Sequence, residues 1–233
     1  MINSFLLIGQ SNMVGRGKRA DVAEILDEKI CVFRNGEWMP AREPYHEDNK
    51  EDECGLGASF AKTLTDRYQK IVGLIPCAVG GTKLEQWQPG EKLYENAVRD
   101  TQAALKNSTL KGVLWHQGEN DSDTEDRASR YEERFYSFMP KLLEQIGGQD
   151  VPLIIGELGE FLKDNSFCYL YPKVMEALHR IADREPNAAI VSSRGLAGQD
   201  DHVHFSAASL RTFGVRYAET WIAQADMMGI ALE

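Results

Sequence analysis

Short apolar runs alternate along this chain with longer stretches in which apolar residues recur every three or four positions. The runs cover residues 5–8, 71–75, 112–115, 153–155 and 188–191. Uninterrupted runs of this kind are typical of strands buried on both faces of a parallel sheet. The amphipathic stretches predict helices over residues 58–68, 94–105, 130–145, 174–182 and 207–225. The alternation predicts an α/β fold, a doubly wound and mostly parallel five-stranded sheet with helices on both faces, in one domain over residues 1–233.

One long stretch, residues 34–57, shows neither pattern. It contains Trp38 and an acidic run over residues 47–53. Loops of this length inside a compact domain are usually functional or mobile. Because like charges repel one another, we expect the acidic run to form a flexible, solvated surface.

Charge and cysteine usage restrict the class of protein. The 233 residues carry a formal net charge of -10, which argues against nucleic acid or an anionic membrane surface as partner. The four cysteines show no CxxC or metal-finger spacing, and no basic segment with a long apolar run precedes the first strand. We therefore expect reduced thiols and a cytoplasmic location. The chain has no metal-binding motif and no phosphate-loop or GxGxxG pattern, so we expect neither a metal nor a cofactor.

Polar and glycine-rich segments come after four of the predicted strands. The first holds Gln10, Ser11 and Asn12, and the others cover residues 78–82, 116–121 and 198–205. The carboxyl ends of parallel strands share one edge of the sheet, where ligands bind in open α/β folds. Alone, Ser11 would be typical of a turn residue or helix cap. Together, the four segments predict one site built from residues that are distant in sequence.

The residue types in these segments match the needs of acyl transfer. A serine hydroxyl requires a base, and an imidazole serves best when a carboxylate fixes its tautomer. Ser11 is the candidate nucleophile, His204 the base and Asp201 the orienting acid. Asp200 with His202 is the alternative pair in a shifted register.

The reaction would also need donors for the negatively charged oxygen of its intermediate. The backbone N–H groups of Ser11 and Gly81 are candidates. A side-chain amide from Gln117 or Asn120 would complete this oxyanion hole.

Four ordered blocks make the chain similar to a known family. They are GQSNM at residues 9–13, GGT at residues 80–82 with Trp87 and Gly90 beyond it, WHQGE at residues 115–119, and DxxHF at residues 201–205. With these blocks the chain resembles the SGNH hydrolase superfamily, and within it the sialate O-acetylesterase and acetylxylan esterase-like group, carbohydrate esterase family six. The resemblance implies a flavodoxin-like three-layer sandwich and a serine esterase that removes O-acetyl groups from a carbohydrate.

The resemblance also implies roles for single residues. It assigns Ser11, His204 and Asp201 to a catalytic triad, and family spacing together with Phe205 favours this register over the shifted one. The superfamily pattern GxND matches residues 118–121 and would make Asn120 the oxyanion donor. The carbohydrate esterase group uses the Gln of HQGE instead, so Gln117 is the first choice and Asn120 the second.

Four further residues are candidates for substrate binding: Gln10, Asn12, Trp87 and Glu119. Trp87, like Trp38, offers a flat face to a sugar, with core packing as the alternative. Glu119 is also a candidate for holding Asn12 in place. His116 is expected to be a partly buried, hydrogen-bonded residue and not a second base.

Two other functions would use the same edge of the sheet. One is a flavodoxin-like protein that binds a flavin nucleotide or another phosphate-bearing cofactor. The other is a protein that binds acetylated glycans without hydrolysing them, against which the complete set of nucleophile, base and acid argues. We favour the esterase, acting on a small saccharide such as an acetylated xylo-oligosaccharide or an O-acetyl sialic acid. A homo-oligomer is left open.

Overall fold

The first apolar run forms the central strand of the protein's main sheet. The computed structural model describes residues 1–233. Its strands are β1 (Ile2–Gly9), β2 (Gly17–Lys18), β3 (Ile30–Arg34), β4 (Glu37–Pro40), β5 (Glu53–Cys54), β6 (Ile71–Pro76), β7 (Ser108–His116), β8 (Leu153–Gly156) and β9 (Ala188–Val191). Seven of them form one sheet in the order β4-β3-β6-β1-β7-β8-β9, while β2 and β5 pair separately. All neighbours in the large sheet are parallel except β3 and β4.

The sheet has two more strands than the sequence predicts. The five predicted strands are all present, as the contiguous series β6-β1-β7-β8-β9, and the α/β prediction is confirmed. The additional hairpin of β3 and β4 lies partly inside the stretch expected to be irregular. Its turn is formed by Asn35 and Gly36, with φ of 53° and 83°. Two positive φ values are what a two-residue hairpin turn requires, and an Asn-Gly pair is the sequence signal for it.

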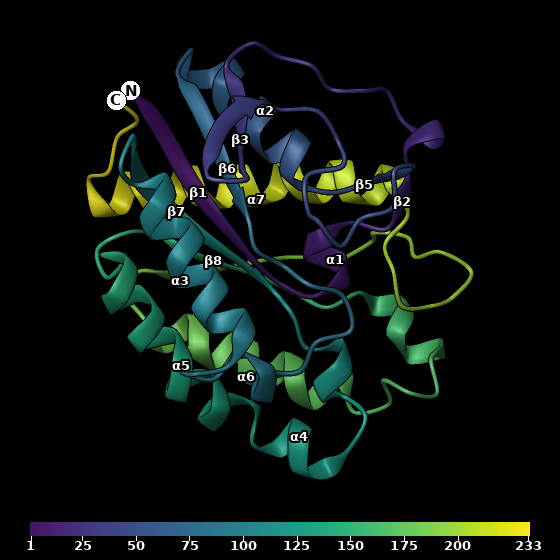
Figure 1. Cartoon of the computed structure of the whole chain (residues 1–233). Helices are drawn as coiled ribbons and strands as arrows, with labels where there is room; N and C mark the ends of the chain where they lie inside the picture. Colours follow the sequence, from purple (N-terminus) through teal and green to yellow (C-terminus); the bar gives the residue numbers. More distant parts are fainter.

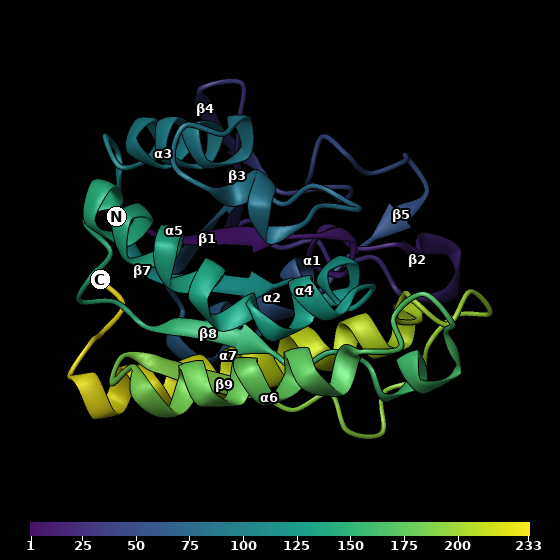
Figure 2. The same ribbon diagram turned by 90° about the horizontal axis from the view of Figure 1, so that it is seen from below.

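Helices cover both faces of the sheet (Figure 1). They are α1 (Ser11–Val14), α2 (Gly57–Tyr68), α3 (Lys92–Ala104), α4 (Glu125–Ser129), α5 (Tyr131–Ile146), α6 (Tyr171–Arg184) and α7 (Ala207–Met228), with short 3-10 turns η1 (Arg19–Asp21), η2 (Leu84–Trp87), η3 (Glu119–Asp121) and η4 (Glu160–Asp164). α2 and α7 pack on one face, and α3, α5 and α6 on the other (Figure 2). No helix combines the length and apolar character that spanning a bilayer would need.

Residues 5–8 of β1 illustrate why the apolar runs have no polar interruption. Phe5 and Leu7 project into the core beneath α2 and α7, while Leu6 and Ile8 project into the core beneath α3 and α5. All four side chains are fully buried. Each burial stabilises the fold by roughly 1.5–3 kcal/mol, so none of these four positions suits a polar residue.

The amino and carboxyl ends of the parallel strands lie on opposite sides of the molecule and hold different parts of the chain. The chain termini lie side by side at the amino end of β1 (Figure 1), where Asn3 hydrogen-bonds to the backbone of Glu233 through both its side-chain nitrogen and oxygen. The segments that follow β1, β6, β7 and β9 lie at the other edge. These are the segments in which the sequence places the chemistry.

Candidate active site

Ser11, His204 and Asp201 lie in one hydrogen-bonded line at the carboxyl edge of the sheet. The distance from Ser11 Oγ to His204 Nε2 is 2.9 Å, and that from His204 Nδ1 to Asp201 Oδ2 is 2.6 Å. Ser11 is only 5% exposed. The imidazole therefore stands between a hydroxyl and a carboxylate, which is the arrangement that a serine nucleophile needs.

The turn after β1 places Ser11 at this edge. Gly9 has a φ of 132°, and a Cβ there would lie 2.0 Å from the carbonyl oxygen of His116. Only glycine tolerates that backbone and that approach. Ser11 then begins α1, in which all four residues are buried, so the hydroxyl is held by rigid structure.

The loop before α7 supplies the other two residues. One carboxylate oxygen of Asp201 accepts the backbone N–H groups of Val203 and His204, each at 2.9 Å. Partial burial would raise the pKa of Asp201, but these two N–H groups and the His204 imidazole outweigh it and hold the pKa below its ordinary value. Asp201 is thus a carboxylate at neutral pH. In the shifted register, His202 is exposed with a left-handed φ of 54° and is not the residue that contacts Ser11.

Asn12 joins the two halves of this arrangement. Its side-chain nitrogen donates to the carbonyl of Val203 at 3.0 Å, and its side-chain oxygen accepts the N–H of Phe205 at 3.0 Å. These two residues flank His204. One amide therefore fixes the histidine loop relative to the serine, although the two segments are about 190 positions apart in sequence.

Behind Asn12 lies a second, fully buried carboxylate–imidazole pair. Glu119 accepts a hydrogen bond from Asn12, and Glu119 Oε1 lies 3.3 Å from Nε2 of His116. On its other side, His116 Nδ1 lies 3.2 Å from the hydroxyl of Tyr217. Burial would raise the pKa of Glu119, but His116 and Asn12 together hold it below its ordinary value. Glu119 is charged and held within the protein.

Ser11, Gly81 and Asn120 each have one N–H hydrogen without an acceptor inside the protein. The backbone N–H groups of Ser11 and Gly81 make no hydrogen bond. Asn120 donates one of its two amide hydrogens to the carbonyl of Gly81 at 2.9 Å, and its oxygen accepts from Gln10 at 3.1 Å. The second amide hydrogen of Asn120 remains free for a ligand.

Gln117 is not available in the same way. Its side-chain nitrogen donates to the carbonyl of Thr82 at 3.0 Å and to Asp121 Oδ2 at 2.6 Å, which uses both hydrogens. Its oxygen accepts from the hydroxyl of Tyr131 at 2.9 Å, and the residue is fully buried. These contacts reverse the order of preference from sequence and favour Asn120 as the side-chain donor.

The loop that carries Gly81 is fixed by the acidic run. Asp48 accepts the N–H of Gly80 at 2.8 Å and forms an ion pair with Arg16. Arg16 also binds Glu53 at 2.8 Å. A Cβ on Gly80 would lie 2.4 Å from Arg16 Nη2, so a side chain there would break this contact. The expectation of a solvated run was wrong for Glu53, which is 9% exposed and paired with Arg16, whereas Asp48 is exposed and pairs with the same guanidinium.

The four residues expected to bind substrate are all buried. Gln10 and Glu119 have no exposed surface and Asn12 has 1%, and their polar groups bond to neighbouring protein atoms. Trp87 is fully buried, packs edge-on against Trp115 with ring centroids 5.7 Å apart, and donates to Thr82 at 3.3 Å. These residues build the site from beneath and present no surface to a ligand. Trp38, on β4, packs against Phe33.

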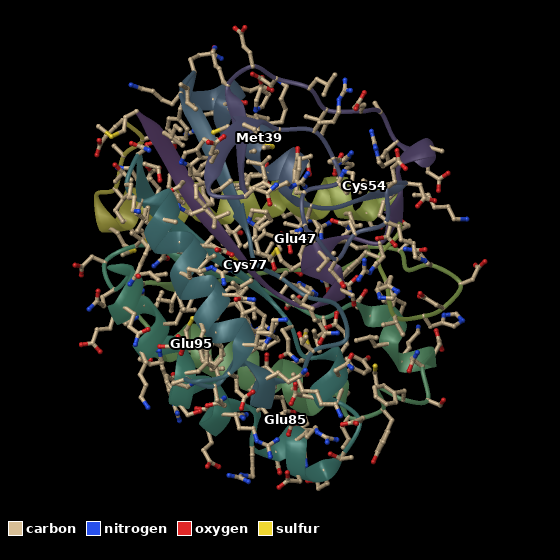
Figure 3. All side chains as sticks on the ribbon, viewed as in Figure 1. Met39, Glu47, Cys54, Cys77, Glu85 and Glu95 are labelled. Carbon is tan, nitrogen blue, oxygen red and sulfur yellow. The ribbon has the colours of Figure 1, made fainter.

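A cavity of about 710 Å³ is lined by residues 75–79, by α3 and by the turn between β3 and β4. Glu47 and Cys77, both labelled in Figure 3, are among its lining residues. None of Ser11, His204 and Asn120 lines it. No group of three or more His, Cys, Asp or Glu side chains is arranged to hold a metal ion.

The chain is similar in sequence and structure to known carbohydrate esterases. The family model of the carbohydrate esterases described as sialic acid-specific acetylesterases matches residues 1–223. The probable carbohydrate esterase At4g34215 of Arabidopsis thaliana is 28% identical over 244 residues, covering 94% of this chain and 90% of that protein. The X-ray structure of this Arabidopsis protein superposes with a TM-score of 0.84 at 26% identity, covering 95% of this chain and 98% of the other. The crystal structure of NanS superposes with a TM-score of 0.78 at 18% identity, covering 97% and 98%, which shows a shared fold.

Proposed function

The chain belongs to the carbohydrate esterase family of sialic acid-specific acetylesterases, with the SGNH hydrolase fold, and we propose that it cleaves O-acetyl groups from a saccharide through an acetyl-serine intermediate. Carboxylic ester hydrolysis is the activity of the family. The residues that perform it and the sugar that carries the acetyl group are our proposal. The 2.9 Å contact between Ser11 Oγ and His204 Nε2, continued to Asp201, is the single observation that carries it.

In the first step, Ser11 Oγ attacks the acetyl carbonyl carbon while His204 Nε2 takes the hydroxyl proton. Asp201 holds the imidazole by its other nitrogen and stabilises the cation that forms. The carbonyl oxygen becomes negatively charged and is met by the N–H groups of Ser11 and Gly81 and by the free amide hydrogen of Asn120. Collapse of this intermediate breaks the ester bond, and His204 returns its proton to the leaving sugar oxygen.

In the second step, a water molecule takes the place of the sugar. His204 removes a proton from the water, which attacks the acetyl-serine at the same carbon. The same three donors hold the oxyanion. Acetate leaves, Ser11 regains its proton from His204, and the enzyme returns to its starting state.

The first candidate for the substrate is an O-acetyl sialic acid, because the matching family is described as specific for sialic acid. An acetylated xylo-oligosaccharide is the second candidate, on the sequence similarity noted above. Both present an acetyl ester on a sugar hydroxyl, so the same three-residue chemistry would serve either.

Acetate release from a panel of O-acetyl sialic acids and acetylated xylo-oligosaccharides tests the proposal. We expect turnover of at least one of them, and labelling of Ser11 by a fluorophosphonate probe that blocks it. The matched control is Ser4→Ala, because Ser4 lies on β1 at the opposite edge from Ser11. Probe labelling that survives in Ser11→Ala and is lost in Ser4→Ala would refute Ser11 as the nucleophile.

A further inference from the structure

The segment between η4 and α6 carries the chain's only exposed aromatic side chains. Phe167 and Tyr169 are 50% and 61% exposed. Cys168 between them is 1% exposed. The backbone thus holds the middle residue inward and turns both aromatic rings toward solvent.

Hydrogen bonds attach this segment to both sides of the candidate active site. Asn165 Nδ2 donates to the carbonyl of Asp201 at 3.3 Å, and Asn165 Oδ1 accepts the N–H groups of Phe167 and Cys168 at 2.9 and 3.1 Å. In Figures 1 and 2 the segment lies beside the loop that precedes α7. The side chain of Asn165 therefore connects the backbone of Phe167 to the backbone of Asp201, the residue whose carboxylate orients His204.

The other end of the segment is fixed to the turn that carries Asn120. The thiol of Cys168 donates to the carbonyl of Glu119 at 3.4 Å, and the N–H of Leu170 donates to the carbonyl of Ser122 at 3.0 Å. These two carbonyls flank Asn120 in sequence. The segment therefore bridges the base side and the oxyanion side of the site along its rim.

The site needs a surface of this kind. Gln10, Asn12 and Glu119 are buried and hydrogen-bonded to other protein atoms, and Trp87 lies in the core. None of these residues therefore offers a face to a sugar ring. A pyranose ring presents a face of C–H groups that loses contact with water when it stacks on an aromatic ring. Two rings on a fixed segment would provide that contact at little cost in conformational entropy.

We propose that Phe167 and Tyr169 form a stacking platform for the pyranose ring whose acetyl group reaches Ser11. This inference rests on the esterase function proposed above and adds to it the surface that selects a sugar. The platform recognises the C–H face that sialic acids and xylo-oligosaccharides share. The two rings would raise the rate for acetylated sugars over acetyl esters of simple alcohols.

The experiment compares kcat/KM for two substrate classes in Phe167→Ala, Tyr169→Ala and the double variant. The sugar substrates are 9-O-acetyl-N-acetylneuraminic acid and acetylated xylobiose in separate arms, and the simple ester is ethyl acetate, whose alcohol has no ring. The ratio of sugar to ethyl acetate activity cancels any general damage to the triad. We expect it to fall about threefold to tenfold for each single variant, more for the double variant, and to recover in Phe167→Tyr and Tyr169→Phe.

Met227→Ala is the matched control, since Met227 is an exposed apolar residue at the end of α7, 76% exposed, at the opposite edge of the sheet. Its ratio should equal that of the wild type. A ratio in the double variant that changes less than threefold in both sugar arms would overturn the platform. Failure of the underlying function gives a different result, namely hydrolysis of all substrates by Ser11→Ala at the wild-type rate.

Discussion

Two carboxylate–imidazole pairs lie within this site, each formed by residues three positions apart, and they differ in exposure. The side chains of Asp201 and His204 are 45% and 24% exposed, whereas those of Glu119 and His116 have no exposed surface. His204 contacts Ser11 Oγ, while Glu119 holds Asn12, which holds the backbone on both sides of His204. Access to a substrate therefore distinguishes a pair that can exchange protons during a reaction from one that fixes the structure around it.

The largest expected effect is the loss of the exposed imidazole or its partner hydroxyl. Ser11→Ala and His204→Ala should each lower kcat by roughly 10⁴ to 10⁶ while the protein folds normally. His116→Ala should instead affect stability. It should lower the free energy of unfolding by about 3–5 kcal/mol, because the buried carboxylate of Glu119 loses its partner. Kinetics on an acetylated substrate and denaturant unfolding measure the two quantities.

The comparison between the pairs would fail under either of two results. If a folded His204→Ala protein kept more than a tenth of wild-type activity, His204 would not be the base of the reaction. A His116→Ala protein of wild-type stability but without activity would place the buried pair in the chemistry itself.

The two amides of the same turn repeat the contrast on a smaller scale. Asn120→Ala should lower kcat by about 10²–10³, as expected for one oxyanion donor, in a protein that still folds. Gln117→Ala should instead destabilise the fold by about 1–3 kcal/mol, because Asp121 and Tyr131 lose a buried partner. If Gln117→Ala were the variant with normal stability and the larger loss of kcat, the choice between the amides would have to be reversed.

The sequence could predict which residues lie together in the site, but it could not separate residues that contact a ligand from buried residues that support them. Apolar runs predicted the five central strands, and the rule that parallel strands end at one edge predicted that Ser11, Asp201 and His204 would lie together. The choice between Asn120 and Gln117 depends on which amide hydrogens are already used, and that information exists only in three dimensions. Buried residues such as Asn12 and Trp87 resemble ligand-binding residues in sequence, because supporting contacts and substrate contacts use the same chemical groups.

A further test of the buried pair uses pH. The pKa of Glu119 is held below its ordinary value, so its contribution to stability is present above the unfolded pKa of about 4.3 and is lost as pH falls through the lower folded pKa. Glu119→Gln should reduce the free energy of unfolding by about 1–3 kcal/mol at pH 7. That difference should shrink below pH 4. Denaturant unfolding from pH 3 to 7 measures it, and a difference independent of pH would mean that Glu119 is not charged in the folded protein.

The smallest expected effect on activity comes from Asp121, a second buried carboxylate in the same turn, whose pKa moves the other way. Burial raises its pKa to about 6, against the effect of hydrogen bonds to Oδ2 from Gln117 and the Leu84 N–H, while Oδ1 has no partner. A raised pKa gives a contribution to stability that is present below about pH 4 and is lost as pH rises through 6.

Asp121→Asn keeps an oxygen for both of these donors and cannot ionise. It should therefore be more stable than the wild type at pH 8, by about 1–3 kcal/mol, and equal to it at pH 4. Activity should change less than twofold, because Asp121 contacts Gln117 and not the free donors beside Ser11. Unfolding curves at the two pH values measure the difference. A variant less stable than the wild type at pH 8 would mean that the turn requires a charged carboxylate at position 121 as well as at position 119. The different partners of Glu119 and Asp121 would then not explain why their pKa values shift in opposite directions.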